Sequence, residues 1–284
     1  MVSLDPKELP IPKLHHILLG GIGPRPICFA STVDEKGNRN LSPFSFFNVF
    51  SANPPILVFS PARSGRTGAT KNTFDNCKAT KEVVVNVVNY SMVQQMSLSS
   101  SPYPKGVDEF VKAGFTPLNS DVVAPARVQE SPVQLECKVI EIKELGKGGG
   151  AGNLIICEIV KIHLNENVLL EDGNIDQQKI DLVARMGGNF YCRANGDALF
   201  EIPKPITSIG IGVDALPAEI RSSKHLSGNQ LGMLGMLEEF PIQSEIDSSE
   251  TFDLSSLLKS VNDHLDRNQS HKALCMLLKN SSIL

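Results

Sequence analysis

Short apolar runs of strand length, separated by turns, dominate the first two hundred residues and constrain the fold more than any other feature. The apolar runs are residues 27–33, 56–60 and 83–88. A polar turn at residues 34–38 sends the chain back through a second strand at residues 39–44, and two longer strands are predicted at residues 133–145 and 154–164. Within the first two hundred residues, helical patterns occur at residues 70–80 and 92–99. Many strands with few, short helices predict a mainly-β, closed or split antiparallel barrel with peripheral helices, and not a doubly wound sheet.

The glycine-rich segment at residues 146–152, GKGGGAG, invites comparison with phosphate-binding loops. Lys147 is not followed by Ser or Thr, as a P-loop requires, and the residues after the segment are typical of a strand and not of a helix. We therefore interpret it as the flexible turn of a long hairpin.

Composition narrows the classes of function. The hydrophobic fraction is 41%, charged residues make up 20%, and the formal net charge is −4, which disfavours nucleic acid as a partner. No apolar run approaches the roughly 20 residues that span a bilayer, so we expect no membrane association. The first twenty residues hold acidic residues and three prolines in a broken pattern, which predicts an extended arm and no signal peptide.

The cysteines and histidines do not form motifs of known chemistry. The six cysteines show no C-x-x-C spacing, which indicates free thiols in a reducing cytoplasm. Cys28, Cys137, Cys157 and Cys192 lie in apolar surroundings and are predicted to be small buried side chains. The six histidines form no metal-ligand pair, so no metal is expected.

Residues 40–71 combine three features that suit a flat aromatic cofactor ending in a phosphate. A loop rich in phenylalanine and hydroxyl residues precedes the buried apolar strand at residues 56–60, and a segment rich in Arg, Ser, Thr and Gly follows it. Such a ring needs an apolar face and backbone hydrogen bonds along one edge. Its phosphate needs cations and hydroxyls.

An ordered series of short motifs resembles the flavin-reductase-like family of FMN-binding split barrels, which includes flavoredoxins and the reductase components of two-component monooxygenases. The series reads RPI at 25–27, STVD at 31–34, NLSPFSFFN at 40–48, KNT at 71–73, PKGVDEF at 104–110, ESP at 130–132, ECK at 136–138, GAGNL at 150–154 and RMGGNFY at 185–191. It covers roughly the first two hundred residues. One departure is Asn72, where the family usually has Asp.

The resemblance implies an FMN site made of several segments. Ser45, Phe46, Phe47 and Asn48 match the stretch whose backbone contacts the isoalloxazine edge. The phosphate region is matched by Ser60, Arg63, Thr70 and Lys71. The closing motif is matched by Gly187, Gly188 and Tyr191, where glycines allow close approach of the backbone and a tyrosine can cap the cofactor. His163 matches a family histidine and is the single candidate for a catalytic role.

The resemblance also implies a fold and an activity. The expected fold is a Greek-key split barrel, paired into a homodimer with FMN at the interface. The expected activity is transfer of hydride from NAD(P)H to flavin, as in a flavin reductase or a flavoredoxin. That transfer needs no acid–base dyad. Two alternatives remain open, an FMN electron carrier fed by a protein donor and a non-enzymatic FMN-binding module. The dinucleotide preference and the final acceptor, a monooxygenase or another molecule, stay undetermined.

The pattern changes after about residue 197. Prolines and glycines form an irregular connector, and then leucines recur at helical spacing in residues 254–265 and again in residues 274–278. We predict two domains, the split barrel at residues 1–197 and an extension at residues 198–284. The short helices of the extension are expected to pack on the barrel or the dimer.

Overall fold

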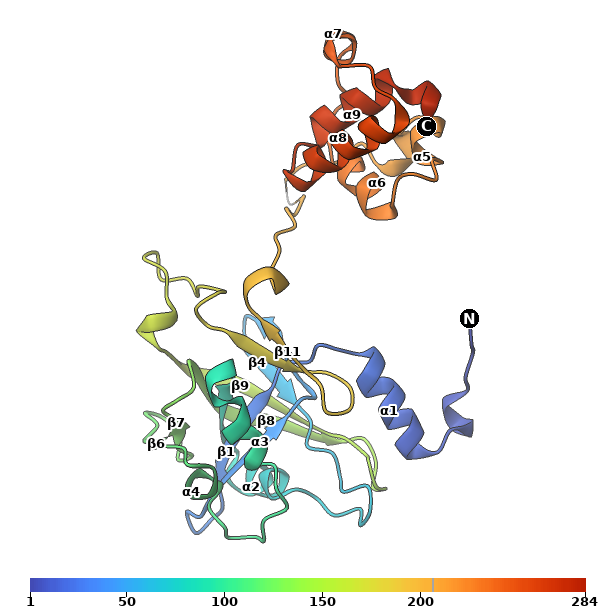
Figure 1. Ribbon diagram of the computed structural model, residues 1–284. Coiled ribbons are helices and arrows are strands. Elements are labelled where there is room, and N and C mark those ends of the chain that lie inside the picture. Colours follow the sequence, from blue (N-terminus) through green and yellow to red (C-terminus); the bar gives the residue numbers. More distant parts are fainter. Residues whose placement is uncertain (206) are drawn as a thin grey trace. The chain divides into compact units, whose positions relative to one another are not determined.

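The computed structural model describes residues 1–205 and 207–284, and it divides the chain into two compact units, Met1–Phe200 and Glu201–Leu284. The first unit, blue to yellow in Figure 1, holds the β-sheets, and the second, orange to red, holds helices. The prediction of a mainly-β chain is only partly right, because helical content is 32%. In the part of the chain that the structure describes, no helix has the length and apolar character to cross a membrane.

A seven-stranded antiparallel sheet is the framework of the first unit. Its order is β2-β1-β5-β8-β9-β4-β3. The strands are β1 (Cys28–Val33), β2 (Arg39–Phe44), β3 (Phe47–Ala52), β4 (Pro55–Phe59), β5 (Glu82–Val87), β8 (Val133–Glu144) and β9 (Asn153–Leu164). The predicted strands at residues 27–33, 39–44, 56–60 and 83–88 correspond to β1, β2, β4 and β5. The consecutive strands β4 and β5 are separated by the β8–β9 hairpin, a connection of the kind that a Greek key requires.

The two edge strands of this sheet are neighbours in the sequence. Strand β2 ends at Phe44 and β3 begins at Phe47, so only Ser45 and Phe46 link the opposite edges. Consecutive Cα atoms are about 3.8 Å apart, so two linking residues span at most about 11 Å. The sheet must therefore curl until its edges meet at one end, which is the geometry of a split barrel.

The glycine-rich loop closes the long β8–β9 hairpin, as predicted. Strand β8 pairs with β9 from Val133 opposite Leu164 to Glu144 opposite Asn153. A Cβ atom on Gly149 would lie 2.8 Å from the carbonyl oxygen of Gly65. Glycine is needed there because the hairpin turn packs against the backbone of the loop after β4.

Two buried clusters fill the first unit. One lies inside the curled sheet and includes Phe59, Val85 and Ile155. The other packs β1 against the helices and includes Phe29, Met96 and Phe110. The helices are α2 (Asn72–Thr80), α3 (Val93–Leu98) and α4 (Glu109–Ala113), and the remaining strands are β6 (Pro117–Leu118), β7 (Arg127–Val128), β10 (Leu182–Arg185) and β11 (Tyr191–Ala194). The first two helices match the predicted helical patterns.

The N-terminal segment corrects the prediction of an extended arm. After a short 3-10 turn, helix α1 (Ile11–Gly21) begins directly after Pro10 and has Pro12 in its first turn. Proline is tolerated there because the first N–H groups of a helix have no intrahelical partner. The broken proline pattern therefore marks a helix start and not extended chain.

The second unit has a hydrophobic core of its own. The predicted leucine repeats lie in α8 (Leu254–Asp266) and α9 (Ser270–Lys279), which bury Leu257, Val261 and Leu274. The described residues of this unit also form α5 (Ala218–Arg221), α6 (Gly228–Gly235) and α7 (Gln243–Ser248). These helices share one core, so their apolar stripes cover one another. The expected packing on the barrel or dimer stays a prediction.

Candidate functional site

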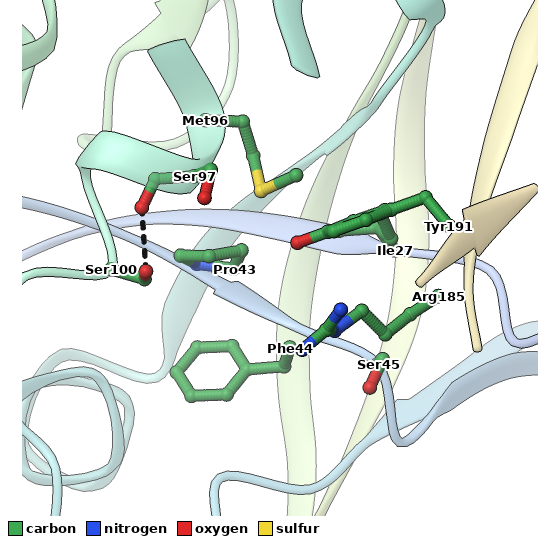
Figure 2. Close-up of a pocket in the computed structure, with 9 residues that line it drawn as sticks. All are labelled: Ile27, Pro43, Phe44, Ser45, Met96, Ser97, Ser100, Arg185 and Tyr191. Atoms are coloured by element: carbon green, nitrogen blue, oxygen red, sulfur yellow. Dashed lines mark hydrogen bonds between the residues drawn. The ribbon is translucent and has the colours of Figure 1, made fainter. Parts of the chain in front are cut away.

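A cavity of about 210 Å³ opens where the end of β2 meets α3 and the β10–β11 hairpin. Figure 2 shows Arg185 and Tyr191 of the hairpin beside Phe44 and Ser45, with Met96 on a further wall. The lining residues are Ile27, Pro43, Phe44, Ser45, Met96, Ser97, Ser100, Arg185 and Tyr191. Apolar rings, hydroxyls and one cation thus surround the space, and none of the lining residues is a carboxylate.

Arg185 provides the positive charge of this cavity. It lies opposite Tyr191 in the hairpin register, and its guanidinium carbon is 4.5 Å from the centre of the Tyr191 ring. A guanidinium over an aromatic face is stabilised by about 0.5–1 kcal/mol and is held in a defined orientation. One of its nitrogens, Nη1, donates to the carbonyl oxygen of Phe190 at 3.2 Å.

A second arginine, Arg25, is paired with Arg185 through the backbone. Arg25 is only 7% exposed, and it donates to the carbonyl oxygens of Leu19 at 2.8 Å and Met186 at 2.9 Å. Burial, and next the nearby charge of Arg185, lower the pKa of Arg25. Arg25 therefore adds positive charge near Arg185 without lining the cavity.

A second cavity of about 190 Å³ adjoins the first. The second cavity shares Ser97 and Tyr191 with the first and is also lined by Tyr90, Val93, Gln94, Val183, Cys192 and Arg193. Arg193 is fixed by Asp181 through hydrogen bonds of 2.7 and 2.8 Å. The prediction that Cys192 is buried is only partly right, since it is half-buried and lines this cavity, whereas Cys28, Cys137 and Cys157 are buried as expected.

The residues predicted to meet the isoalloxazine edge divide into two groups. Ser45 lines the cavity. Phe46 is 39% exposed, and its ring contacts that of His15 in α1 edge-on. The backbone carbonyl oxygen of Phe46 accepts the Ser60 N–H at 2.8 Å. Phe47 and Asn48 begin β3 and pair with Phe59 and Val58. Their roles toward a flavin therefore stay predictions, and the backbone carbonyl of Phe46 is already engaged.

Two residues of the predicted phosphate region hold the local backbone. Ser60 Oγ accepts the Asn153 N–H at 3.0 Å, which ties β4 to β9. Arg63 donates to Glu144 Oε2 at 2.7 Å and to the Gly68 carbonyl oxygen at 3.2 Å. The Arg63 hydrogen bond, with the charge of Lys78, lowers the pKa of Glu144. Arg63 can reach a phosphate only by sharing its guanidinium with Glu144.

Thr70 and Lys71 lie at the start of α2. Thr70 Oγ1 donates to Asp75 Oδ1 at 2.9 Å. Lys71 is the exposed N-cap residue, and no side chain caps the helix. The departure from the family at Asn72 coincides with this uncapped start. The first N–H groups of a nine-residue helix and the Lys71 ammonium together suit an anion.

His163 lies away from the cavity lining, in a hydrogen-bonded network. Its Nε2 is 2.6 Å from Oε1 of the fully buried Glu136. The same carboxylate accepts three backbone N–H groups, from Asp121 at 2.9 Å, Val122 at 2.7 Å and Val123 at 3.1 Å. Burial alone raises the pKa of Glu136, but the hydrogen bonds from Asp121, His163 and Val122 outweigh it, and the pKa is lowered.

Three residues of this network carry atoms that could bind a metal ion. Side-chain atoms of Asp121, Glu136 and His163 lie within 4.8 Å of one another. Both Glu136 oxygens already accept two hydrogen bonds each, so they have no lone pair directed at a cation. The group is therefore a carboxylate clamp on the loop before β7 and not an open metal site.

The closing glycines form the turn of the β10–β11 hairpin. Gly188 has a φ of +58°, in the left-handed region that glycine favours. A Cβ atom on Gly187 would lie 2.9 Å from the Cα atom of Gly20. The chain segment that approaches Gly187 closely is therefore the end of α1. The sequence did not indicate this contact.

Arg185 is a cavity residue that the sequence did not indicate, although the motif RMGGNFY begins there. An arginine six residues before a tyrosine carries no signal of its own. Only the hairpin register brings the two side chains together. Figure 2 shows how they share one wall of the cavity.

The curled sheet places the chain in the class of split-barrel proteins, and the comparisons connect it to flavin reductases. The family model described as "Flavin reductase like domain" matches residues 21–179. Nitrilotriacetate monooxygenase component B from Bacillus cereus is similar, with a TM-score of 0.66, 29% identity, and coverage of 71% of this chain and 98% of that one. A Shewanella frigidimarina protein assigned as a flavin reductase with split barrel domain has a TM-score of 0.60, 31% identity, and coverage of 70% and 95%.

Sequence relatives extend over the same part of the chain. An uncharacterized protein from Aquifex aeolicus is 34% identical over 197 residues, which is 69% of this chain and 97% of the relative. The chain belongs to the flavin-reductase-like family. Its membership places it among flavin-related redox proteins.

Proposed function

We propose that this chain is an FMN-binding oxidoreductase that transfers hydride from NAD(P)H to flavin. The observation that carries the proposal is the cavity in which Ser45 and Tyr191, which the family resemblance assigns from separate motifs, meet beside the cationic Arg185. When bound, the flavin supplies the redox chemistry by accepting a hydride and passing electrons on. The protein has to bind, orient and shield it.

The residues present fit such a cofactor. The cavity joins apolar rings to hydroxyls, and its single charged lining side chain is a cation, so it accommodates an aromatic ring system that gains negative charge on reduction. The uncapped start of α2 with Lys71 supplies donors for a terminal phosphate. Ser60, Arg63 and Thr70 hold the loops around that position through the hydrogen bonds described above.

The absence of an acid–base pair in the cavity lining supports hydride transfer over proton-transfer chemistry. Orientation of the two ring systems is the main requirement, and Tyr191, with its ring fixed by Arg185, can provide an aromatic wall. His163 is engaged by Glu136, so we assign it a structural part in this mechanism.

We also propose a homodimer. Edge strand β3 exposes Val49 at 55% and Phe50 at 69%, next to the 39% exposed Phe46. An exposed, apolar edge strand needs cover, and a second copy of the chain supplies it. Analytical ultracentrifugation tests this directly, because Phe50→Lys is expected to shift the protein toward monomer.

The reductase activity is tested by absorption spectroscopy. The purified protein mixed with FMN under anaerobic conditions is expected to bleach when NADH or NADPH is added. Bleaching by a protein donor alone indicates an electron carrier. A flavin that binds but is never reduced indicates a non-enzymatic binding module, and either result refutes NAD(P)H dependence.

The phosphate assignment is tested by Lys71→Ala. Loss of a charged hydrogen bond costs about 1.5–3 kcal/mol, so FMN affinity should fall roughly ten-fold or more, while riboflavin, which lacks the phosphate, should be little affected. Lys78→Ala is the matched control, since Lys78 lies on the same helix but contacts Glu144 and the Phe74 ring. Equal losses for FMN and riboflavin would show that Lys71 acts on the fold.

A further inference from the structure

Three side chains of the C-terminal unit are aligned in an order typical of nucleophilic sites. Cys275 and His271 lie four residues apart on α9, so they share one face of the helix. The Cys275 Sγ atom is 3.9 Å from His271 Nδ1, and His271 Nε2 is 3.5 Å from Oε2 of Glu245 on α7. Each nitrogen of the ring thus faces one partner, the thiol on one side and the carboxylate on the other.

All three side chains line one cavity of about 440 Å³ between α7, α8 and α9. That volume lies within the range of small-ligand sites. The other charged or titratable groups that face it are Glu250, His264 and Lys272, and the remaining walls include Ser260 and Met276. Cys275 is only 6% exposed, so a reagent reaches its sulfur through this cavity and not from open surface.

Cys275 differs from the core cysteines of the first unit. Burial raises the pKa of Cys275, as it does that of Cys28, Cys77, Cys137 and Cys157. The other four lie in the first unit, and none of them lines the cavities at Tyr191 or the cavity beside Cys275. Cys275 has both an adjoining cavity and a histidine with a carboxylate behind it, the arrangement that activates a thiol.

We propose that Cys275, with His271 as its base and Glu245 orienting that base, is a covalent modification site for small disulfides. Every residue of this site belongs to the C-terminal unit, whereas the residues of the proposed flavin site belong to the first unit.

The exchange step balances without a further reagent. The Cys275 sulfur attacks one sulfur of the small disulfide, a new S–S bond forms, and the S–S bond of the reagent breaks. The Cys275 proton passes to His271 Nδ1 and then to the departing thiolate, which leaves as a thiol. Cys275 is oxidised and the reagent is reduced by the same electron pair.

His271 has to take the Cys275 proton as the sulfur attacks the disulfide. Burial, and next the charge of Glu245, raise the pKa of Cys275, so the thiol is protonated at rest. A base within reach is therefore needed to form the thiolate, the attacking species. Glu245 stabilises the imidazolium that results, in the way a triad carboxylate does.

The test uses the full chain, oxidised glutathione as the probe, and peptide mass spectrometry to measure the modification rate of each cysteine. We expect Cys275 to form the mixed disulfide and His271→Gln to slow it by roughly ten-fold. General-base assistance accelerates a reaction by about 10²-fold or more when the hydrogen bond to the base is fully formed. We expect a smaller effect here because the contact between Cys275 and His271 is long. Glu245→Gln is expected to slow the reaction a few-fold.

His264→Gln is the matched control, since His264 lines the same cavity but its Nδ1 lies 2.7 Å from Gln269. In His264→Gln, Cys275 should react at the same rate as in the original sequence. The half-buried Cys192 should react at the same rate in both histidine variants. An unchanged rate in His271→Gln overturns the proposal. So does equal slowing by His264→Gln, or a Cys275 that reacts only after denaturation. Circular dichroism shows whether each variant is folded.

Discussion

Replacing Glu136 by glutamine tests the buried carboxylate clamp, and its effect can be worked out from the hydrogen bonds. The carboxylate is fully buried on β8 and accepts three backbone N–H groups of residues 121–123 in addition to its contact with His163. Glutamine keeps one acceptor oxygen and places an NH₂ group, a donor, where the other stood. At least one buried N–H is then left without a partner.

An unsatisfied buried donor costs about 1–3 kcal/mol, and the loss of the negative charge weakens the hydrogen bonds that remain. We therefore expect Glu136→Gln to lower the free energy of unfolding by about 3 kcal/mol at neutral pH. For a unit of this size that corresponds to a melting temperature roughly 6–12 °C lower. Glu141→Gln is the control, because Glu141 is exposed on the same strand and should change stability by less than about 0.5 kcal/mol.

The pH dependence has a definite sign. The pKa of Glu136 is lowered in the folded protein, so the ionised group adds stability above its ordinary value of 4.5, and this contribution is lost as the pH falls through the lower pKa of the folded state. The difference between the two proteins should therefore shrink in acid. Chemical denaturation across this range is the assay. A variant as stable as the original at neutral pH, or a difference that persists unchanged in acid, would refute the reasoning.

Two further predictions concern the ends of the chain. Gly187→Ala places a Cβ atom 2.9 Å from the Gly20 Cα, so it should cost about 1–3 kcal/mol or displace α1, detected as faster tryptic cleavage at Lys13. Gly20→Ala, whose own Cβ meets nothing within 4 Å, should behave like the original sequence, and equal cleavage in both variants would contradict the contact. Deleting the residues after Ile202 should leave FMN affinity unchanged, because the predicted contacts all lie in the first unit. Loss of FMN binding in titrations of a folded truncated protein would contradict that assignment.

The sequence alone was sufficient to predict those strands, turns and helices that depend on neighbouring residues. Apolar runs of five to seven residues between turn signals form β1, β4 and β5, and the glycine-rich segment forms the turn of the β8–β9 hairpin. The leucine repeats became α8 and α9 for the same reason, since periodicity is a property of neighbouring residues. The family motifs also identified Ser45 and Tyr191, which the fold brings into one cavity.

Tertiary structure decided which partner each polar side chain has. Arg63 and Glu144 are 81 positions apart and meet only because the β8–β9 hairpin lies beside the loop after β4. His163 faces Glu136 through the register of that hairpin, and Arg185 reaches Tyr191 through the register of another. Helix α1 and its contact with Gly187 depend likewise on chain segments far apart in sequence. Hydrogen bonds and ion pairs act over a few ångströms, so their partners are determined by which distant segments the folded sheet places side by side.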